Sequence, residues 1–524
     1  MIGKRAFTVI FAAGLAAGLT ACSSGAPSSS AGGSTYSSHV LRSAFSAGLS
    51  PLDPDTYYEA EGLAITTAAY QTLLSYRPNS SQLEGLLATS WSVSPDGLTY
   101  TFQLRPGVRF SDGTPFNSAA VKATFERRIT MKGGPSYMLA EVSSMDTPSP
   151  HTFVVHLKQP VAPFLNYLAS PYGPLMTSPA AVAQHAASSD HAAGWLADHT
   201  AGTGPYVLAS VRKGVGYVLA YNKDYWGPKP YFTKIVFSIV PDFSTQLLEL
   251  ENGQLDMVLH GLSTQEYQSL AANSKYTVVN PPALFKAQVW INPASAVFGP
   301  MGARRGLQAA LNVKQLTNQV FGTRGMASTQ FYPAGMLPNG AVPDSPAYHP
   351  ALLPAAVSGD KGKKVVIGYY GDNSLQQLAD HIQVTLQNAG LNATVQPENP
   401  AQVFALPTTP SARPDLLVAS MNPDAAQVDT WSRIYQYTNG AVNFLGCHLS
   451  SADHTLNQAL VNPSPARSRA QYAAAGDLYR NSLCWINIAD VHDTIAARAG
   501  LCGWSHQLPW VFVTEFATLR PCTR

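Results

Sequence analysis

Four cysteines toward the C-terminal end are the side chains whose spacing bears most directly on chemistry: Cys447, Cys484, Cys502 and Cys522. Thiols of this kind either bind a soft metal such as zinc or oxidise to disulfides. No C-x-x-C or H-x-x-x-H spacing accompanies them, so the sequence predicts neither a metal site nor a cofactor. Four cysteines allow three disulfide pairings, of which we favour Cys447–Cys484 and Cys502–Cys522.

The other reactive side chains show no spacing typical of an enzyme. The histidines are scattered, as His448, His454 and His492 illustrate, and we expect them on the surface or in the core. A serine hydrolase would be expected to carry G-x-S-x-G and a metallopeptidase H-E-x-x-H, and the sequence has neither. A glycoside hydrolase needs only two carboxylates from any part of the chain. That class stays open as a remote alternative, and otherwise we expect no enzyme.

The N-terminus predicts export and a lipid anchor. Lys4 and Arg5 precede an apolar stretch, residues 6–19, that is too short to span a bilayer as a stable helix. It ends in Leu19-Thr20-Ala21-Cys22, which resembles the lipobox of bacterial lipoproteins, whose cysteine receives a diacylglycerol. Two acyl chains are what stable attachment to a membrane requires. An ordinary signal peptide with a chance cysteine is the alternative. Residues 23–38, rich in Ser, Gly and Ala, then predict a flexible tether.

The composition of the sequence limits the class of protein and the kinds of partner to expect. The formal charge is +2, and loss of residues 1–22 with their two cations would leave a neutral protein. Neutrality without basic runs argues against nucleic acid as a partner. Only 12% of the residues are charged, while Gly (40) and Pro (39) are plentiful, which is typical of a loop-rich globular protein. A chain of 524 residues is too long for one core, so we expect two or more lobes.

Hydrophobic periodicity predicts the elements that position these side chains. Residues 98–105 alternate between apolar and polar, which predicts a half-buried strand between two Pro-, Asp- and Gly-containing turns. Residues 118–130, behind the capping candidate Asn117, and residues 303–320 predict helices. Residues 364–419 alternate strand, helix and strand, which predicts a smaller α/β lobe. We expect the C-terminal residues, 488–524, to return to the first lobe. Lobe I is then residues 39–285 and 488–524, and lobe II is residues 286–487. The two crossings between the lobes would form a hinge.

Ordered blocks along the chain carry a family resemblance. They are WSVSPDGLTYTF (91–102), LRPGVRF (104–110), DGTPF (112–116), GTGPY (202–206), DYWG (224–227), LENGQLD (250–256) and RRGLQAAL (304–311). In this order they resemble the family 5 extracellular solute-binding proteins, the peptide- and nickel-type receptors of ABC importers. The resemblance extends over nearly the whole chain after residue 22.

The resemblance implies a fold and a function. The fold is an α/β, bilobal periplasmic-binding-protein-like fold of the large class II, or cluster C, type with mixed sheets. Such a receptor closes by a hinge around an extended oligopeptide or dipeptide and delivers it to the permease subunits of an ABC importer. We expect a monomer attached to the outer side of a bacterial cell membrane, in the periplasm or on the outer face. Other family members bind metal chelates, haem, oligosaccharides or opines, and a relative that acts as a sensor is a further alternative.

The resemblance also implies a ligand-binding acidic residue in lobe II, which pairs with the ligand's α-ammonium. The matching stretch makes Asp424 the candidate, with Asp429 as the fallback. The family's usual Trp is replaced around Ser420-Met421, and its Asp-Pro is here Pro423-Asp424. Further candidates are taken from the neighbourhood of Asp424 and from the segment after the first strand, each with packing in its own core as the alternative: Met421, Asn422, Trp431, Tyr435, Tyr57 and Tyr58.

Overall fold

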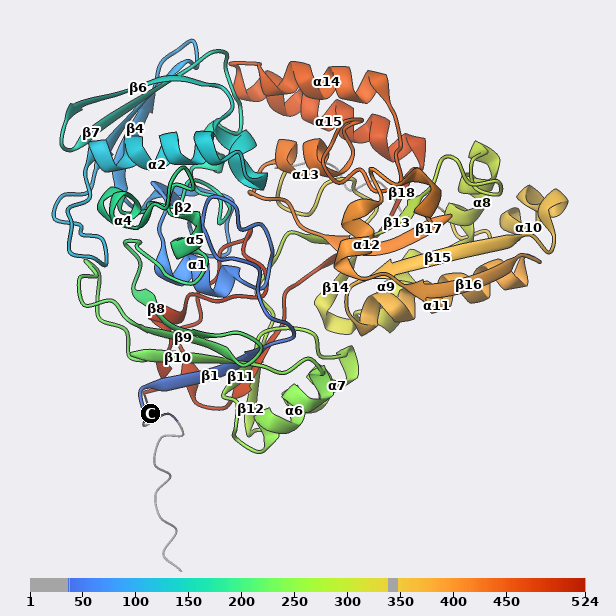
Figure 1. The fold of residues 1–524 in the computed structure, drawn as a ribbon. Helices are drawn as coiled ribbons and strands as arrows, with labels where there is room; N and C mark the ends of the chain where they lie inside the picture. Colours follow the sequence, from blue (N-terminus) through green and yellow to red (C-terminus); the bar gives the residue numbers. More distant parts are fainter. Residues whose placement is uncertain (1–35, 37, 338–346, 524) are drawn as a thin grey trace, which may run out of the picture.

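The computed structural model describes residue 36, residues 38–337 and residues 347–523. The expected signal peptide, Cys22 and most of the expected tether lie outside these residues. Within them the chain forms two lobes (Figure 1). We define the first lobe by its four- and three-stranded sheets and the second by its six-stranded sheet. Among the described helices, none is both long enough and apolar enough to cross a membrane.

The first lobe is built around two four-stranded sheets and one three-stranded sheet. Their strand orders are β4-β5-β7-β6, β1-β10-β9-β8 and β11-β19-β12. Tyr100, Phe102 and Leu104 of β5 are buried, which confirms the strand expected from the alternating pattern. The strands of the three sheets are β1 (Val40–Phe45), β4 (Ala88–Val93), β5 (Thr99–Leu104), β6 (Val142–Ser149), β7 (Thr152–Leu157), β8 (Tyr206–Arg212), β9 (Gly216–Tyr221), β10 (Lys234–Ile239), β11 (Met257–Val258), β12 (Tyr276–Val279) and β19 (Ile495–Arg498).

Short helices and two small two-stranded sheets complete this lobe. The longest helix, α2, begins where the sequence predicts, because the Asn117 side chain accepts a hydrogen bond from the Ala120 amide at 3.0 Å. These two sheets pair β2 (Leu74–Tyr76) with β3 (Leu83–Gly85) and β20 (Leu501–Cys502) with β21 (Arg520–Pro521). The helices are α1 (Leu63–Ala69), α2 (Ser118–Met131), η1 (Gly134–Leu139), α3 (Phe164–Tyr167), α4 (Pro179–His185), α5 (Ala193–Leu196), α6 (Phe243–Glu251), α7 (Thr264–Ala271) and η5 (Phe516–Thr518).

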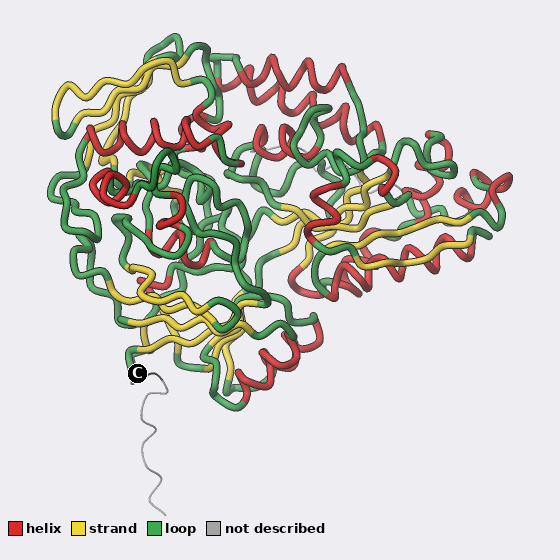
Figure 2. The backbone as a smooth tube through the Cα atoms, in the orientation of Figure 1, coloured by secondary structure: helices red, strands yellow, loops and turns green. Residues whose placement is uncertain are grey.

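The second lobe is a mixed six-stranded sheet covered on both faces by helices (Figures 1 and 2). The strand order is β14-β18-β13-β17-β15-β16, with β15 parallel to β16 and β17 and β13 antiparallel to β17 and β18. The strands are β13 (Phe285–Ile291), β14 (Gly325–Ala327), β15 (Lys364–Tyr370), β16 (Asn392–Pro397), β17 (Leu416–Met421) and β18 (Trp485–Val491). This arrangement confirms the expected bilobal α/β fold with mixed sheets.

The helices of the second lobe differ from the prediction made from the sequence in one place. The helix expected over residues 303–320 is two helices, because Leu311 is extended and Asn312 caps a new helix by accepting from the Gln315 amide at 3.1 Å. The helical segments are α8 (Met301–Ala310), α9 (Val313–Val320), η2 (Gly322–Arg324), α10 (Leu352–Ala356), η3 (Ser358–Asp360), α11 (Asn373–Asn388), α12 (Pro400–Ala405), η4 (Pro410–Ala412), α13 (Val428–Tyr435), α14 (Ser450–Leu460) and α15 (Pro465–Ser482).

The chain passes between the lobes twice, once before β13 and once after β18. The expected first boundary, at residue 285, falls where β13 begins. The expected second boundary, before residue 488, falls inside β18, which pairs with β13 through Val491. The chain therefore enters the first lobe's sheet only at β19. The two crossing segments contact each other, because the Thr494 hydroxyl donates to the Asn280 side chain at 2.9 Å.

The position of Tyr36 shows that the tether expected over residues 23–38 ends before residue 36. Its side chain is buried, and its hydroxyl donates to the carbonyl of Arg498 at 2.6 Å. Its own carbonyl accepts from the Tyr231 hydroxyl at 2.8 Å. The ordered first lobe therefore includes Tyr36, which the sequence assigned to the tether.

Both expected disulfides are present. Cys447 is joined to Cys484 across 37 residues of the second lobe, and Cys502 is joined to Cys522 across 20 residues at the end of the chain. Cys447 and Cys484 are buried in the core between the six-stranded sheet and the helices α13 to α15. The first bond therefore ties the loop after α13 to the start of β18.

We expect the double variant Cys447→Ala/Cys484→Ala to lose about 2–4 kcal/mol of unfolding free energy, because the cross-link restricts a long loop of the unfolded chain. Urea denaturation followed by circular dichroism would measure the loss. A double variant with unchanged unfolding free energy would contradict the expectation. Cys502→Ala/Cys522→Ala, which opens the shorter loop, is the companion variant.

The apolar core runs across the junction of the lobes. One cluster of buried residues includes the core of the first lobe and the layer between the six-stranded sheet and α13 to α15. A second cluster fills the other face of that sheet. The amide of Ala162, in the first lobe, donates to the carbonyl of Leu460 at the end of α14 at 2.8 Å. The lobes are therefore in contact along this side.

Candidate functional site

The loop between β17 and α13 carries Asp424 from the second lobe onto the first. β17 ends at Met421, and Pro423 cannot continue the ladder because it has no amide hydrogen. The Gln427 side chain accepts from the Asp429 amide and so begins α13. These two local signals confine the loop to residues 422–427. Asp424 is 4% exposed there.

Three hydroxyl groups of the first lobe bind Asp424. The Tyr137 hydroxyl donates to Oδ2 of the carboxylate at 2.6 Å, and the Tyr58 hydroxyl donates to the same oxygen. The Ser170 hydroxyl donates to the Asp424 carbonyl at 2.5 Å. Two residues after Asp424, the amide of Ala426 donates to the Tyr76 hydroxyl at 3.1 Å. We call this set of contacts the hydroxyl junction; both bonds to the carboxylate use Oδ2.

Burial changes the acidity of Asp424. Loss of water raises the pKa of this carboxyl to about 6, and the hydrogen bonds from Tyr137 and Tyr58 oppose part of that rise. Near neutral pH the carboxylate is therefore charged and in contact with neutral donors only. A cation that reaches Oδ1 would lower the pKa and relieve the cost of burial.

The segment that carries Tyr58 is held by buried ion pairs. Arg127 and Arg128 of α2 bind Asp53 and Asp55, which follow β1 (closest N–O distances 2.6 and 2.9 Å for Arg127–Asp53 and Arg128–Asp55). Arg128 also donates to the carbonyls of Pro54 at 2.8 Å and of Tyr172 at 2.6 Å. The edge of the Tyr58 ring faces that of Tyr172, with centroids 5.1 Å apart. One helix therefore positions both aromatic segments.

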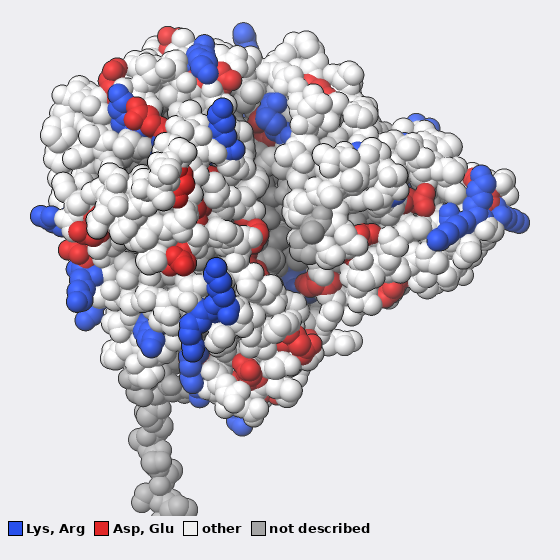
Figure 3. Space-filling view, viewed as in Figure 1, with Lys and Arg blue, Asp and Glu red and all other residues white. Residues whose placement is uncertain are grey.

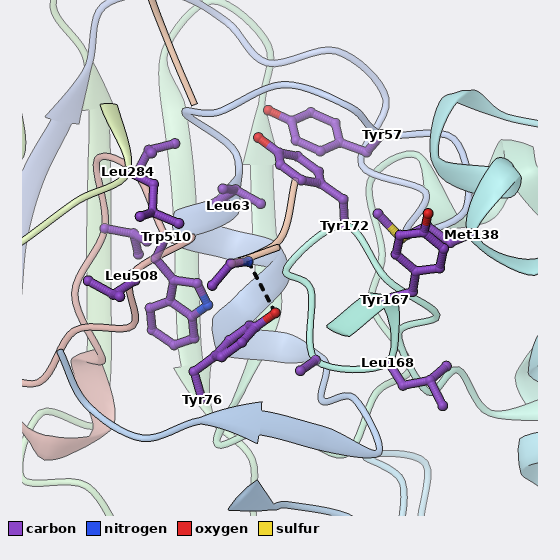
Figure 4. Packing of buried hydrophobic residues seen from close by; sticks show 14 of the residues in the cluster. Tyr57, Leu63, Tyr76, Met138, Tyr167, Leu168, Tyr172, Leu284, Leu508 and Trp510 are labelled. Carbon is purple, nitrogen blue, oxygen red and sulfur yellow. Dashed lines mark hydrogen bonds between the residues drawn. The ribbon is translucent and has the colours of Figure 1, made fainter. Parts of the chain in front are cut away.

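The aromatic side chains named from the sequence divide between core and site. Trp431 is 0% exposed in the core, with its ring 5.1 Å from that of Tyr435, which favours the packing alternative for Trp431. Tyr435 donates its hydroxyl to the Asn422 carbonyl at 2.9 Å and so shapes the loop. Tyr57 is buried and accepts the Gly62 amide at 2.7 Å, while its neighbour Tyr58 reaches Asp424. Figure 4 shows Tyr57 and Tyr172 beside each other in the first lobe.

The remaining named residues lie at the end of β17 and the start of α13. Met421 is buried and is paired in register with Lys286 of β13. Asn422 follows it and joins the site through its carbonyl. Asp429, the fallback for Asp424, is 0% exposed and both of its oxygens bind Arg433, at 2.7 and 2.8 Å. Asp429 is therefore already neutralised within its own helix, which leaves Asp424 as the candidate.

Three residues of the hydroxyl junction and one neighbour of it could not be found from the sequence with any local pattern. Tyr76, Tyr137 and Ser170 are separated from their partners by 350, 287 and 254 residues, and Tyr172 lies next to them. Tyr76 and Ser170 also line a cavity of about 160 Å³ inside the first lobe. This cavity is lined by first-lobe residues. It lies behind the junction, whereas the hollow between the lobes is visible in Figure 3.

The described residues hold no group of three or more His, Cys, Asp or Glu side chains arranged to bind a metal ion. The groups that the site offers to a ligand are one carboxylate, tyrosine rings and hydroxyl groups.

Comparison with known proteins shows which proteins this chain is similar to. The "Probable D,D-dipeptide-binding periplasmic protein DdpA" of Escherichia coli K12 is 32% identical over 289 residues, which is 54% of this chain and 55% of that relative, so the match spans about half of its length. A glutathione-binding protein, GsiB, of Escherichia coli O1:K1 is 26% identical over 83% of this chain and 86% of its own.

Among solved structures, the periplasmic binding protein DppA of Helicobacter pylori in complex with the peptide STSA has the same fold. Its TM-score is 0.78 at 22% identity, covering 92% of this chain and 98% of that one. The family model of the bacterial extracellular solute-binding proteins, family 5, matches residues 82–443. The chain therefore belongs to the family 5 bacterial extracellular solute-binding proteins.

Proposed function

We propose that this protein is the solute receptor of an ABC importer and binds short peptides between its lobes, with the ligand's α-ammonium on Asp424. One observation carries the proposal. A carboxylate from one lobe is buried against the other, its Oδ2 takes both tyrosine hydroxyls, and no hydrogen bond of the described residues uses its Oδ1. An ammonium group supplies both the charge and the donors that Oδ1 lacks.

The same carboxylate couples binding to closure. A pKa raised from 3.8 to about 6 corresponds to about 3 kcal/mol against the charged, closed and empty state. In an open state Asp424 would be hydrated, so this cost falls on closure. A ligand ammonium offsets it only when the lobes are together, and binding therefore shifts the population toward the closed form. The permease would recognise that form.

The relatives support peptides as the ligand class, since the names of two of them refer to D,D-dipeptides and to glutathione. We propose in addition that the mature protein acts outside the cytoplasm, as a monomer attached through a diacylglycerol on Cys22. The motif Leu19-Thr20-Ala21-Cys22 and the Ser-rich residues after it support this attachment.

Native mass spectrometry of the chain from residue 23 onward tests the ligand class. The protein is purified, denatured to release any bound solute, refolded and offered an equimolar mixture of di- to pentapeptides beside the same peptides N-acetylated. We expect bound masses from the free-amine mixture only. Equal binding of both mixtures, or binding of neither, would overturn the proposed role of Asp424 and of peptides.

A further inference from the structure

The second crossing between the lobes is anchored on both sides of Asp493. The amide of His492 donates to the carbonyl of Arg324, in η2 of the second lobe, at 2.8 Å. The carbonyl of Thr494 accepts from the hydroxyl of Tyr267, in α7 of the first lobe, at 2.9 Å. A rotation of one lobe against the other therefore has to change the backbone around Asp493, because its two neighbours are bonded to different lobes.

Asp493 in turn holds the backbone of Phe512. The Asp493 side chain is buried, and its Oδ2 accepts from the Phe512 amide at 2.7 Å. Phe512 has a φ of 58°, which lies in the left-handed region that a bulky residue rarely adopts. The hinge is therefore bonded directly to a strained residue of the first lobe.

The neighbours of Phe512 keep it in this conformation. His506 donates from Nδ1 to the carbonyl of Val513 at 3.0 Å. Val511 and Val513 are both 0% exposed. The residues on either side of Phe512 are thus fixed in the core, and Asp493 fixes the amide between them. Backbone strain persists only where its surroundings enforce it, and it is found at ligand clamps and switch regions.

The Phe512 ring contacts both lobes. It stacks on the ring of His260, in the first lobe, with centroids 4.0 Å apart, and its centroid lies 5.4 Å from that of Phe285, the first residue of β13. His260 also binds Glu61 at 3.0 Å. Glu61 comes three residues after Tyr58, which binds Asp424. The contacts of this ring therefore extend from the sheet of the second lobe to a segment that contributes to the site.

We propose that Phe512 is strained only while the lobes are closed and relaxes as they open, so that its strain favours the open state of the empty receptor. Opening moves Phe285 with the second lobe and displaces the Asp493 carboxylate, so two of the contacts that hold Phe512 are lost together. The inference rests on the proposed closure around a ligand and adds a device that opposes closure without one. Since the strain belongs to the closed state alone, ligand binding has to offset it.

Calorimetry on a glycine and an alanine variant tests this inference. Phe512→Gly and Phe512→Ala both remove the ring, but only glycine adopts a positive φ without strain. Each protein is titrated at pH 8 with the free-amine peptide that the wild type binds most tightly in the di- to pentapeptide mixture. We expect Phe512→Gly to bind this peptide about fivefold more tightly than Phe512→Ala does.

The possible failures of this experiment are distinct. Equal affinities of the two variants would overturn the inference and leave the proposed function standing, because strain that is the same in the open and closed states changes only the unfolding free energy. If the wild type binds no peptide of the mixture, the proposed function fails and the inference fails with it.

Ser188 provides the matched control. It also has a positive φ, of 56°, and it lies exposed in the loop between α4 and α5. Ser188→Gly and Ser188→Ala differ in strain in the same way, but we expect them to bind the peptide equally. A fivefold ratio at Ser188 as well would show that the effect does not belong to the hinge.

Phe512→His extends the test to a variant that keeps a ring, in case loss of the ring prevents folding. Histidine occurs at positive φ more often than phenylalanine does. We therefore expect Phe512→His to bind the peptide about twofold more tightly than the wild type. An unchanged or weaker affinity would count against strain as the cause.

Discussion

Asp424→Asn is expected to weaken the binding of a free-amine peptide about 100-fold at pH 7, equivalent to about 3 kcal/mol. The substitution keeps the shape of the side chain and an oxygen that can accept from Tyr58 and Tyr137. It removes the negative charge that the ammonium requires. Calorimetry of both proteins with one dipeptide measures the change, and an affinity within threefold of the wild type would remove Asp424 from the site.

The pH dependence of binding separates a charge effect from a structural one. In the closed, ligand-free structure burial raises the pKa of Asp424 to about 6. Binding of an ammonium needs the deprotonated form, so affinity should be constant above about pH 6.5 and fall by up to tenfold per pH unit as the pH drops below 6. This fall should be absent from Asp424→Asn. Loss of affinity only near pH 4 would instead indicate that the ligand-free protein is open, with Asp424 hydrated.

Tyr137→Phe provides a second, milder variant for the same profile. It removes one of the two hydroxyls that lower the Asp424 pKa. We therefore expect the decline in affinity to begin at a higher pH than in the wild type, with the fold preserved. A decline that moves to lower pH would contradict the assigned hydrogen bond.

Arg128→Met is expected to have the largest effect on stability, lowering the unfolding free energy by about 3–5 kcal/mol. Arg128 is 0% exposed, and its guanidinium binds Asp55, the Pro54 carbonyl and the Tyr172 carbonyl. Methionine occupies similar space, but it leaves two carbonyls unpaired and removes one of the two arginines that bind Asp55. Urea denaturation would measure the loss.

Lys122→Met is the matched control for Arg128→Met. Lys122 lies on the same helix, is paired with Glu126 at 3.9 Å, and has a side chain that is 40% exposed. Its loss should change the unfolding free energy by less than about 0.5 kcal/mol. Equal effects from the two substitutions would show that the helix as a whole, and not the buried ion pairs, sets the stability of the first lobe.

Much of the fold follows from patterns of neighbouring residues. The strand at residues 99–104 alternates with a period of two, Asn117 caps a helix, and Asp242 caps another by accepting from the Thr245 amide. Both disulfides also agree with the favoured pairing. The break at Leu311 was missed, because a helix interruption between two apolar stretches leaves little trace in the periodicity. The second lobe boundary was placed inside β18, because the strand is continued by its pairing with β13.

The site was predictable only in part. Asp424 could be named because the family resemblance covers the end of β17, and the structure places its carboxylate at the junction. Its partners Tyr137 and Ser170 lie in a different lobe, and no spacing in the sequence relates them to it. Trp431 was named for its place near Asp424 in the sequence. Its ring packs inward, because one side of α13 must cover the sheet.

The buried Tyr36 has a consequence for where the receptor can operate. If Cys22 carries the lipid, residues 23–35 are the whole leash between the bilayer and the folded protein. Fully extended, a chain of this length reaches at most about 50 Å. The end of the first lobe near β1 and Arg498 would then stay within about 50 Å of the lipid surface. Encounters with a permease would be a two-dimensional search at high local concentration, instead of a three-dimensional one.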